Sequence, residues 1–431
     1  MTRGAVRLGL AALAIGALLI ALIAWLNLRG EDPLVPDAAA PTSPELIARG
    51  AYLARAGNCM GCHTDRGGAA YAGGRGVPTP FGTVFAPNLT PDTASGLGAW
   101  TAAEFWRALH NGRARDGRLL YPAFPYPNYT RVTRADSDAI FAFLRSLPAV
   151  AQPNRGHTLQ FPFDQPAALA IWRALYFRPA PSAPAQLDQA RSPEWTRGAY
   201  LVEGLGHCNA CHASRNALGA TASPLDLAGG LIPVQNWYAP SLASPLEAGV
   251  ADWSDAHVVE LLRTGVSARG AVMGPMSEVV SGSTQHLSES DLRAMATYLK
   301  ALPPPTSERA AGAPALSTTA ATGPGAKLYD THCTACHGER GEGVPGVYPA
   351  LAASRAVVMH TPANLVHMVL EGGFPPATGG NPRPYGMPPF ATVLSNDEVA
   401  QLLTHIRSSW GNQGAPVSAL DVTRFRGVSA R

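Results

Sequence analysis

The chain has 431 residues, of which 46% are hydrophobic and 15% are charged, and its formal net charge at pH 7 is +3. This composition excludes a disordered polyelectrolyte and a nucleic-acid binder that depends on a basic surface. At roughly 150 residues per domain, the length predicts about three domains. The 44 glycines and 39 prolines indicate small helices joined by long ordered loops.

The chain begins with an uncharged run from Leu8 to Leu26, which follows Arg3 and Arg7. At about 1.5 Å per residue this run nearly spans a hydrocarbon core of ~30 Å, and it is longer than the apolar region of a usual signal peptide. The positive flank is expected to stay in the cytoplasm. We therefore expect residues 8–26 to anchor the protein in the bacterial cytoplasmic membrane, with the remainder on the periplasmic side. Cleavage as a signal segment near residues 38–40 is the alternative.

All six cysteines fall into three Cys-X-X-Cys-His motifs. Two thiols on one helical turn can add to the two vinyl groups of a haem, and the histidine that follows then faces the iron. A single motif could be a redox pair, and a zinc site would need further ligand pairs at finger spacing, but three motifs that use every cysteine favour haem attachment. We therefore predict three covalently bound haem c groups, held by Cys59, Cys62 and His63, by Cys208, Cys211 and His212, and by Cys333, Cys336 and His337.

Three kinds of helix recur along the chain. An Arg-Gly-Ala-Tyr-Leu segment precedes the first two motifs and a weaker copy precedes the third, and its glycine predicts a close helix crossing. An amphipathic helix that ends at glycine follows each motif, and a closing helix with apolar residues at helical spacing completes each unit. These helices are expected at 49–53, 197–201 and 325–329, then at 100–112, 253–265 and 361–372, and finally at 136–147, 288–302 and 395–410.

The repeat predicts an all-α fold, because no segment shows a convincing period of two. We expect three small helical haem domains in tandem after the N-terminal anchor or signal segment at 1–30, with domain boundaries at 44–150, 191–303 and 323–412. The Pro-rich stretches at 151–192 and 303–322 are expected to be linkers. An apolar stretch in the first linker, at 171–177, is expected to pack across a domain seam.

The sixth ligand of each iron must come from elsewhere in its domain, and a methionine thioether there raises the reduction potential. Met273 and Met276 both precede the closing helix of the second domain, and we predict Met276 as its ligand. We predict Met387 as the ligand in the third domain, where prolines stiffen the loop. The alternative for either methionine is a role as a core filler. In the first domain Phe124 occupies the ligand position.

Three possibilities remain for the first iron: His110 swings in, a ligand arrives from outside the domain, or the iron is five-coordinate or water-bound. His110 shares its register with Arg263, which argues against a ligand role, and a surface or haem-propionate contact is its alternative. His157 lies in the linker and is the weaker candidate. The remaining histidines, among them His367 and His405, are expected at helical or loop surfaces.

The exported part, over about 49–410, resembles the triheme cytochrome c subunits of membrane-bound periplasmic dehydrogenases that act on alcohols, gluconate, sorbitol and aldehydes. The resemblance is carried by Thr-Pro-Phe-Gly-Thr at 79–83, Asn-Leu-Thr-Pro-Asp at 88–92, Gly-Leu-Gly-Ala-Trp at 96–100, the loop at 121–126, Gly-Pro-Met at 274–276 and Ile-Arg-Ser-Ser-Trp-Gly-Asn at 406–412. It implies class I cytochrome c domains. Much of the family carries methionine where this chain has Phe124, and in this departure the chain resembles the subset linked to molybdenum hydroxylases.

The resemblance also implies a function. Electrons would enter from a quinoprotein, flavoprotein or molybdoprotein dehydrogenase and leave to ubiquinone or a terminal oxidase, and the chain would be an electron-transfer subunit with no substrate-oxidising site of its own. The first haem, lacking methionine, would have the lowest potential. The alternative is a peroxidase-like haem enzyme that uses an open iron in the first domain. A haem-based sensor is weaker, because only a short polar tail follows Trp410.

Overall fold

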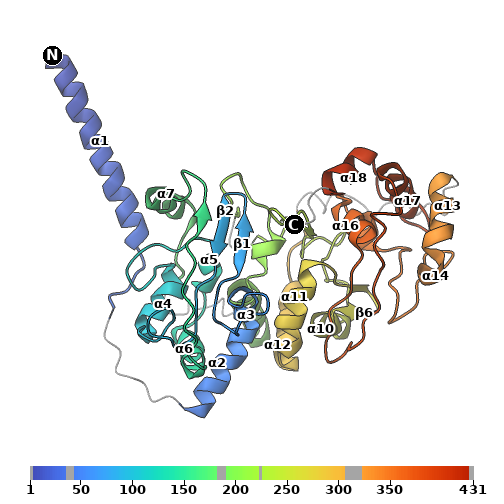
Figure 1. Ribbon diagram of the computed structural model, residues 1–431, viewed down its shortest axis with the longest axis horizontal. Coiled ribbons are helices and arrows are strands. Elements are labelled where there is room, and N and C mark those ends of the chain that lie inside the picture. The colour runs from blue at the N-terminus through green and yellow to red at the C-terminus, as the bar shows by residue number, and fades with distance from the viewer. Residues whose placement is uncertain (1–2, 35–42, 182–190, 223–225, 306–322, 427–431) are drawn as a thin grey trace. The chain divides into compact units, whose positions relative to one another are not determined.

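The computed structural model describes residues 3–34, 43–181, 191–222, 226–305 and 323–426 (Figure 1). Contacts divide the described residues into two compact units. Unit 1 takes its residues from Met1–Ala54, Cys62–Leu187 and Ala217–Ala220, and unit 2 takes its residues from Arg55–Gly61, Asp188–Asn216 and Thr221–Arg431. The second and third Cys-X-X-Cys-His motifs therefore lie in the same unit.

The expected all-α fold of three tandem class I cytochrome c-like domains is wrong. Seven short strands within the described residues form one three-stranded and two two-stranded antiparallel sheets, and the contacts define two compact units instead of three. The strands are β1 (Gly76–Thr79), β2 (Gly82–Phe85), β3 (Thr158–Leu159), β4 (Gly230–Leu231), β5 (Tyr238–Ala239), β6 (Val266–Ser267) and β7 (Gly270–Ala271). Strands this short leave no period-two pattern in the sequence.

Helices make up most of both units. Unit 1 contains α1 (Arg3–Leu28), most of α2 (Pro44–Ala56), α4 (Ala102–Asn111), α5 (Tyr126–Tyr129), α6 (Arg134–Ser146) and α7 (Pro166–Tyr176). The short helix α3 (Cys59–Cys62), which carries the first cysteine pair, takes its residues from both units. Unit 2 contains α8 (Pro193–Ala199), η1 (Tyr200–Leu205), α9 (Asn209–His212), α10 (Asp255–Thr264), α11 (Pro275–Gly282), η2 (Thr284–His286), α12 (Glu289–Lys300), α13 (Pro324–His332), α14 (Thr334–His337), α15 (Arg355–Val358), α16 (Ala363–Glu371), α17 (Asn396–Ser408) and α18 (Ala419–Arg426).

The predicted amphipathic and closing helices are confirmed, and local signals set their ends. Thr101 caps α4 in a reciprocal capping box with Glu104, and Gly112 ends this helix in the left-handed conformation with φ of 60°. Ser254 caps α10, and Gly265 ends it with φ of 80°. The two helices therefore begin and end by the same devices.

Each predicted close helix crossing is present. A Cβ atom added to the glycine of the preceding helix would lie 1.8, 2.0 or 2.2 Å from a backbone carbonyl oxygen of the closing helix, for Gly50 on Ala139, Gly198 on Ala294 and Gly325 on Gln401. No side chain fits at such a distance, so glycine is required. The crossing fixes the helix that leads into each Cys-X-X-Cys-His motif.

Ion pairs reinforce the first two crossings. Arg49 Nε donates to Asp136 Oδ1 at 2.9 Å, and the Asp136 side chain is buried. Arg197 forms two hydrogen bonds with Asp291, at 2.8 and 2.7 Å. A planar guanidinium that bonds both carboxylate oxygens holds the two helices in one orientation.

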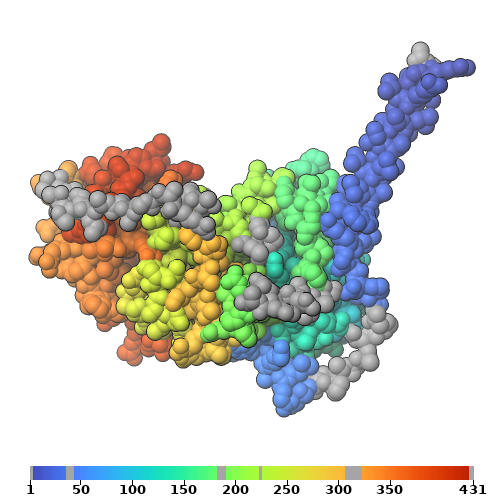
Figure 2. All heavy atoms as spheres, turned by 180° about the vertical axis from the view of Figure 1, so that it is seen from behind, coloured from blue at the N-terminus to red at the C-terminus, as the bar shows by residue number. Residues whose placement is uncertain are grey.

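Helix α1 has the length and the apolar composition of a membrane span, with a mean hydropathy of 2.5, and none of its residues is buried. Figure 2 shows the N-terminal part of the helix standing clear of the other residues of unit 1. Its C-terminal end packs on α7, where Asn27 donates to the Ala170 carbonyl at 2.9 Å and accepts from Arg173 at 3.0 Å. The apolar stretch at 171–177 packs on α1, and its Trp172 also donates to the carbonyl of Leu218, a residue of the predicted second domain, at 2.9 Å.

The segment after α1 is also attached to unit 1. Arg113 Nε donates to Glu31 at 2.8 Å, and Asn111 donates to the Gly30 carbonyl at 3.0 Å. Arg173 is 2% exposed, although it is the one charged residue of α7. The predicted cleavage region at 38–40 and most of the predicted linker at 303–322 lie outside the described residues.

The segment after Trp410 is more than a polar tail. It forms α18, and this helix buries Val422 and Phe425 in a hydrophobic cluster with residues of α16 and α17. The cluster also contains Tyr329 and Cys333, so the third motif rests on the same core.

Candidate haem sites

The second and third motifs each lie on a single short helical turn. The backbone N–H groups of Cys211 and His212 point to the carbonyl of Cys208, at 3.2 and 2.9 Å, and the same two bonds recur in the third motif at 3.2 and 2.9 Å. Both thiols and the histidine of a motif therefore belong to one turn, as attachment to a single haem requires. The first cysteine pair likewise lies on the short helix α3, and all six cysteines are free of disulfide bonds.

The histidine of each motif is held in the same way. Its Nδ1 atom lies within hydrogen-bond distance of a proline carbonyl oxygen, at 2.8 Å for His63 on Pro87, 2.7 Å for His212 on Pro240 and 3.0 Å for His337 on Pro349. A carbonyl only accepts, so Nδ1 carries the proton and Nε2 keeps its lone pair. This is the tautomer that ligates a metal through Nε2, with an outer hydrogen bond that orients the ring.

Burial also favours the neutral form of the three motif histidines. It lowers the pKa of His63, His212 and His337, although the hydrogen bond to the proline carbonyl acts in the opposite direction. Burial and the neighbouring cysteine raise the pKa of Cys208 to about 12 and that of Cys333 to about 11. These two thiols are therefore protonated at neutral pH, which disfavours a thiolate metal site. The residues of the three motifs fit covalently attached haem.

The prolines that orient the histidines were not predicted from the sequence. A signal was available, because each proline begins a Pro-X-Leu tripeptide after its motif, at 87–89, 240–242 and 349–351. The tripeptides follow their histidines at different distances, so the repeat of the helices does not reveal them.

The structure places Phe124 and Met276 at equivalent positions of two hairpin loops. In unit 1 the loop begins at the left-handed Gly112, whose carbonyl accepts from the N–H of Leu120, four residues before Phe124. In unit 2 it begins at Gly265, whose carbonyl accepts from Val272, four residues before Met276. Phe124 and Met276 are both partly buried. Both residues therefore follow a glycine-initiated loop at the same spacing, with Phe124 just before α5 and Met276 at the start of α11.

Met387 is fixed by a backbone pair at the end of α16. Its N–H donates to the carbonyl of Gly373 at 2.8 Å, and its carbonyl accepts from Gly373 at 3.0 Å. Met387 packs, partly buried, against the core cluster of unit 2. The pairing holds this residue on a rigid loop.

Three other histidines are buried. His110 is 1% exposed and stacks on Trp106 with ring centroids 4.4 Å apart. His367, on α16, stacks on Trp237 with centroids 4.8 Å apart, and His405, on α17, packs edge-on against Trp410. The expectation that His367 and His405 lie at the surface is wrong.

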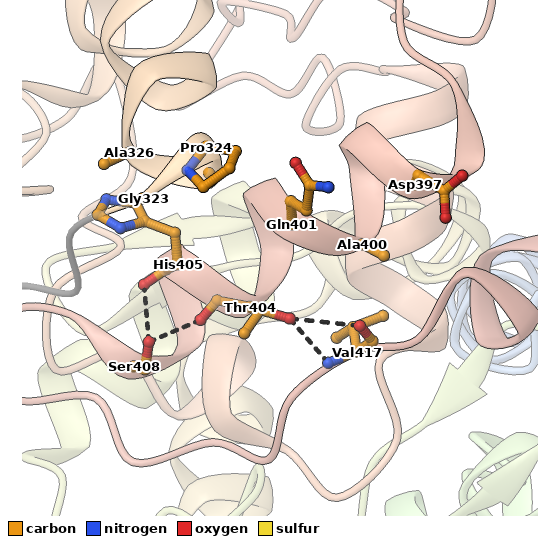
Figure 3. Close-up of a pocket in the computed structure, with 11 residues that line it drawn as sticks. Gly323, Pro324, Ala326, Asp397, Ala400, Gln401, Thr404, His405, Ser408 and Val417 are labelled. Carbon is orange, nitrogen blue, oxygen red and sulfur yellow. Dashed lines mark hydrogen bonds between the residues drawn. The ribbon is translucent and has the colours of Figure 1, made fainter.

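A surface pocket lies where α13 crosses α17 (Figure 3). It is lined by Gly323, Pro324 and Gln401 and by Thr404, His405 and Ser408, and Thr404 and Ser408 are satisfied by hydrogen bonds within unit 2. None of its lining residues belongs to a Cys-X-X-Cys-His motif or to the loops that carry Met276 and Met387. The pocket is therefore separate from the candidate haem sites.

The comparisons with known proteins agree with the assignment of the motifs as haem-attachment sites. The Cytochrome c family model matches residues 47–148 and 323–410. The chain is 38% identical to the cytochrome c subunit of the quinone alcohol dehydrogenase of Komagataeibacter europaeus, over 89% of this chain and 85% of that protein. It is 37% identical to the gluconate 2-dehydrogenase cytochrome c subunit of Pantoea cypripedii, over 88% of this chain and 89% of that protein. It is 40% identical to one subunit of the nicotinate dehydrogenase of Pseudomonas putida, over 91% of this chain and 33% of that protein.

The motifs and the geometry of their histidines define a c-type cytochrome. The chain belongs to the family of cytochrome c subunits of dehydrogenases. It is an electron-transfer cytochrome, and the relatives named above give the peroxidase alternative no support.

Proposed function

We propose that the chain carries electrons from a dehydrogenase catalytic subunit to ubiquinone or a terminal oxidase through three covalently bound haem groups. The observation that carries the proposal is the repeated pairing of a motif histidine with a proline carbonyl, which leaves three Nε2 atoms free to bind iron. Haem bound at these sites supplies an iron that cycles between its ferrous and ferric states.

The protein's own residues attach and orient these groups. The six cysteines form the covalent links, and His63, His212 and His337 supply the axial ligand on one side. Met276 and Met387 supply the second axial ligand at the second and third sites. A thioether ligand raises the potential, so the chain sets the redox properties of each site by its choice of this residue.

The partner is a dehydrogenase catalytic subunit, because the relatives are subunits of dehydrogenases named for alcohol, gluconate and nicotinate. A quinoprotein, a flavoprotein or a molybdoprotein could fill this role. Phe124, the departure from much of the family, favours a molybdoprotein among them. Co-purification of the tagged full chain from its native membrane, followed by mass spectrometry, identifies the catalytic subunit.

We also propose that α1 is retained as an anchor and that the haem sites lie on the periplasmic side. Arg3 lies at the start of α1, and the far end is integrated into unit 1 through Asn27 and Glu31. Removal of α1 would leave Arg173, which is 2% exposed, without its hydrogen bond to Asn27. Arg173 would keep its hydrogen bond to the Gly112 carbonyl, but a buried guanidinium that loses one of its hydrogen bonds is destabilised, which favours retention.

The number of haems tests the proposal directly. The full chain, produced with a haem-attachment system, is expected to bind three haems by the pyridine haemochrome assay, and replacing Cys208 and Cys211 together with alanine is expected to remove one. A parent protein with fewer than three haems, or a double variant with an unchanged count, contradicts the proposal. Reoxidation of the reduced chain by a soluble ubiquinone analogue tests the acceptor.

A further inference from the structure

The first and second haem sites have loops that begin alike and carry different residues at the ligand position. Both loops start at a left-handed glycine, close with the same backbone hydrogen bond at 2.8 Å and reach the ligand position four residues later. Met276 stands there in unit 2 and Phe124 stands there in unit 1. A phenyl ring has no lone pair to offer an iron, so this loop supplies no ligand at the first site.

The loop around Phe124 is also held in place. Tyr121 donates through its hydroxyl to the carbonyl of Phe163 at 3.0 Å, and the Phe124 ring packs on Tyr129 with centroids 5.4 Å apart. The Phe124 N–H donates to the Tyr121 carbonyl, and the Phe124 carbonyl accepts from Tyr126. These contacts fix the phenyl ring and the loop that carries it.

His110 is not placed to replace the missing methionine. Both of its ring nitrogens are fully buried, and its ring stacks against Trp106. Burial lowers the pKa of His110 and outweighs the backbone carbonyls and the Asp32 carboxylate, which act in the opposite direction, so the ring is neutral. An iron cannot approach nitrogens that are closed off in this way, and a ligand role would require α4 to be repacked.

His157 lies nearer to the loop but has the wrong tautomer. Its ring packs edge-on against Tyr121, with centroids 5.3 Å apart, and its Nδ1 accepts a hydrogen bond from the Phe85 N–H at 3.1 Å. Burial and the positive charge of Arg118 lower its pKa, so the ring is neutral and Nε2 carries the proton. The three motif histidines have the opposite arrangement, with Nδ1 protonated and Nε2 free.

No other side chain of the segment offers a nitrogen or sulfur ligand of the kind that c-type cytochromes use. Between residues 100 and 188 the sequence contains these two histidines and no methionine, cysteine or lysine. Met60 lies between the two cysteines of the first motif, on the turn that attaches the haem, and cannot reach the opposite face.

We propose that the first haem site has no sixth ligand from the protein and binds a small external ligand, namely a diatomic molecule such as carbon monoxide or a small anion such as cyanide. The inference rests on the proposed function, because it requires a haem on Cys59, Cys62 and His63. The second and third sites, closed by Met276 and Met387, do not bind such ligands under the same conditions.

Carbon monoxide titration of the purified, reduced full chain tests the proposal. We expect about one carbon monoxide per three haems, together with one high-spin signal in the electron paramagnetic resonance spectrum of the oxidised protein. Phe124→Met is expected to abolish binding and to convert that signal to a low-spin one. Phe161→Met, a change at a side chain that is 81% exposed in the same unit, is the matched control and is expected to bind like the parent.

The parent titration does not depend on any variant folding. A parent protein with three haems that binds no carbon monoxide overturns the inference while leaving the proposed function intact. Binding that appears only in His110→Gln or His157→Gln also overturns it, because that histidine is then the ligand. A parent with fewer than three haems contradicts the proposed function instead. Binding that persists unchanged in Phe124→Met shows that position 124 does not control the site and overturns the assignment.

Discussion

The loop of unit 1 that leads to Phe124 and the loop of unit 2 that leads to Met276 begin in the same way and differ in the side chain at the ligand position. Gly112 and Gly265 begin the loops in the same left-handed conformation, after helices that begin with equivalent caps. The helix and the start of the loop that lead to the ligand position are therefore alike in the two units, whereas the side chain at that position differs. One side-chain replacement changes the electronic properties of a site while the fold around it stays the same.

The largest effect expected from this comparison concerns the shared framework. Gly198→Ala puts a methyl group 2.0 Å from the Ala294 carbonyl, so we expect the free energy of unfolding to fall by about 3 kcal/mol or more. Gly50→Ala should behave alike in unit 1. Chemical denaturation of the holoprotein measures both, and Gly156→Ala, where no atom lies within 4 Å, is the control. A stabilised Gly198→Ala variant would show that the crossing is not close-packed.

The next effect concerns the ligand. Met276→Phe gives the second site the side chain of the first, so the carbon monoxide bound per chain is expected to rise from one to two. Met273→Phe changes a methionine of the same loop that is not assigned as a ligand, and it should leave the stoichiometry unchanged. If Met273→Phe opens the site and Met276→Phe does not, Met273 is the ligand.

The reduction potentials of the three haems extend the comparison between the two ligand positions. Because thioether ligation raises the potential, we expect the first haem to titrate lowest of the three. Phe124→Met should raise it by about 59 mV or more, which is at least a tenfold change in the equilibrium constant of a one-electron couple. A redox titration followed by electron paramagnetic resonance measures each site. A first haem at or above the others contradicts the expectation.

The smallest expected effect concerns the N-terminal caps of α4 and α10. Glu104 closes the capping box of α4, whereas the equivalent residue of α10 is His257, whose side chain makes no such bond. Glu104→Ala is expected to lower the free energy of unfolding by about 0.5 kcal/mol, and His257→Ala should leave it nearly unchanged. Equal losses in thermal unfolding experiments would show that the box contributes nothing beyond the Thr101 cap.

Features that depend on nearby residues were predictable from the sequence. The spans of α4 and α10 follow from apolar periodicity with a polar cap before and a glycine after, and the closely packed Gly50 follows from its repeat at Gly198. The attachment residues follow from the motif itself, since two cysteines and a histidine at fixed spacing lie on one turn.

Features that depend on distant residues were not predictable. The carbonyl of Pro240 meets His212 from 28 residues away, and His367 is buried by Trp237, which lies far from it in the sequence. The short strands were not predicted because two to four residues are too few to show the alternation of apolar and polar side chains that marks a strand. Helix α18 was not predicted because its composition is polar; Val422 and Phe425 pack on the core, and Arg426 donates to the carbonyls of Ala391 and Leu394.

The junction between α1 and unit 1 determines how far the first haem site can travel. Asn27 donates to the Ala170 carbonyl and accepts from Arg173, and Glu31 accepts from Arg113, so the helix and the unit are joined at several points. With α1 held in a bilayer, these bonds would keep unit 1 close to the membrane surface, in contrast to a cytochrome on a flexible tether. A catalytic subunit that stays docked on such a cytochrome would meet it at that surface.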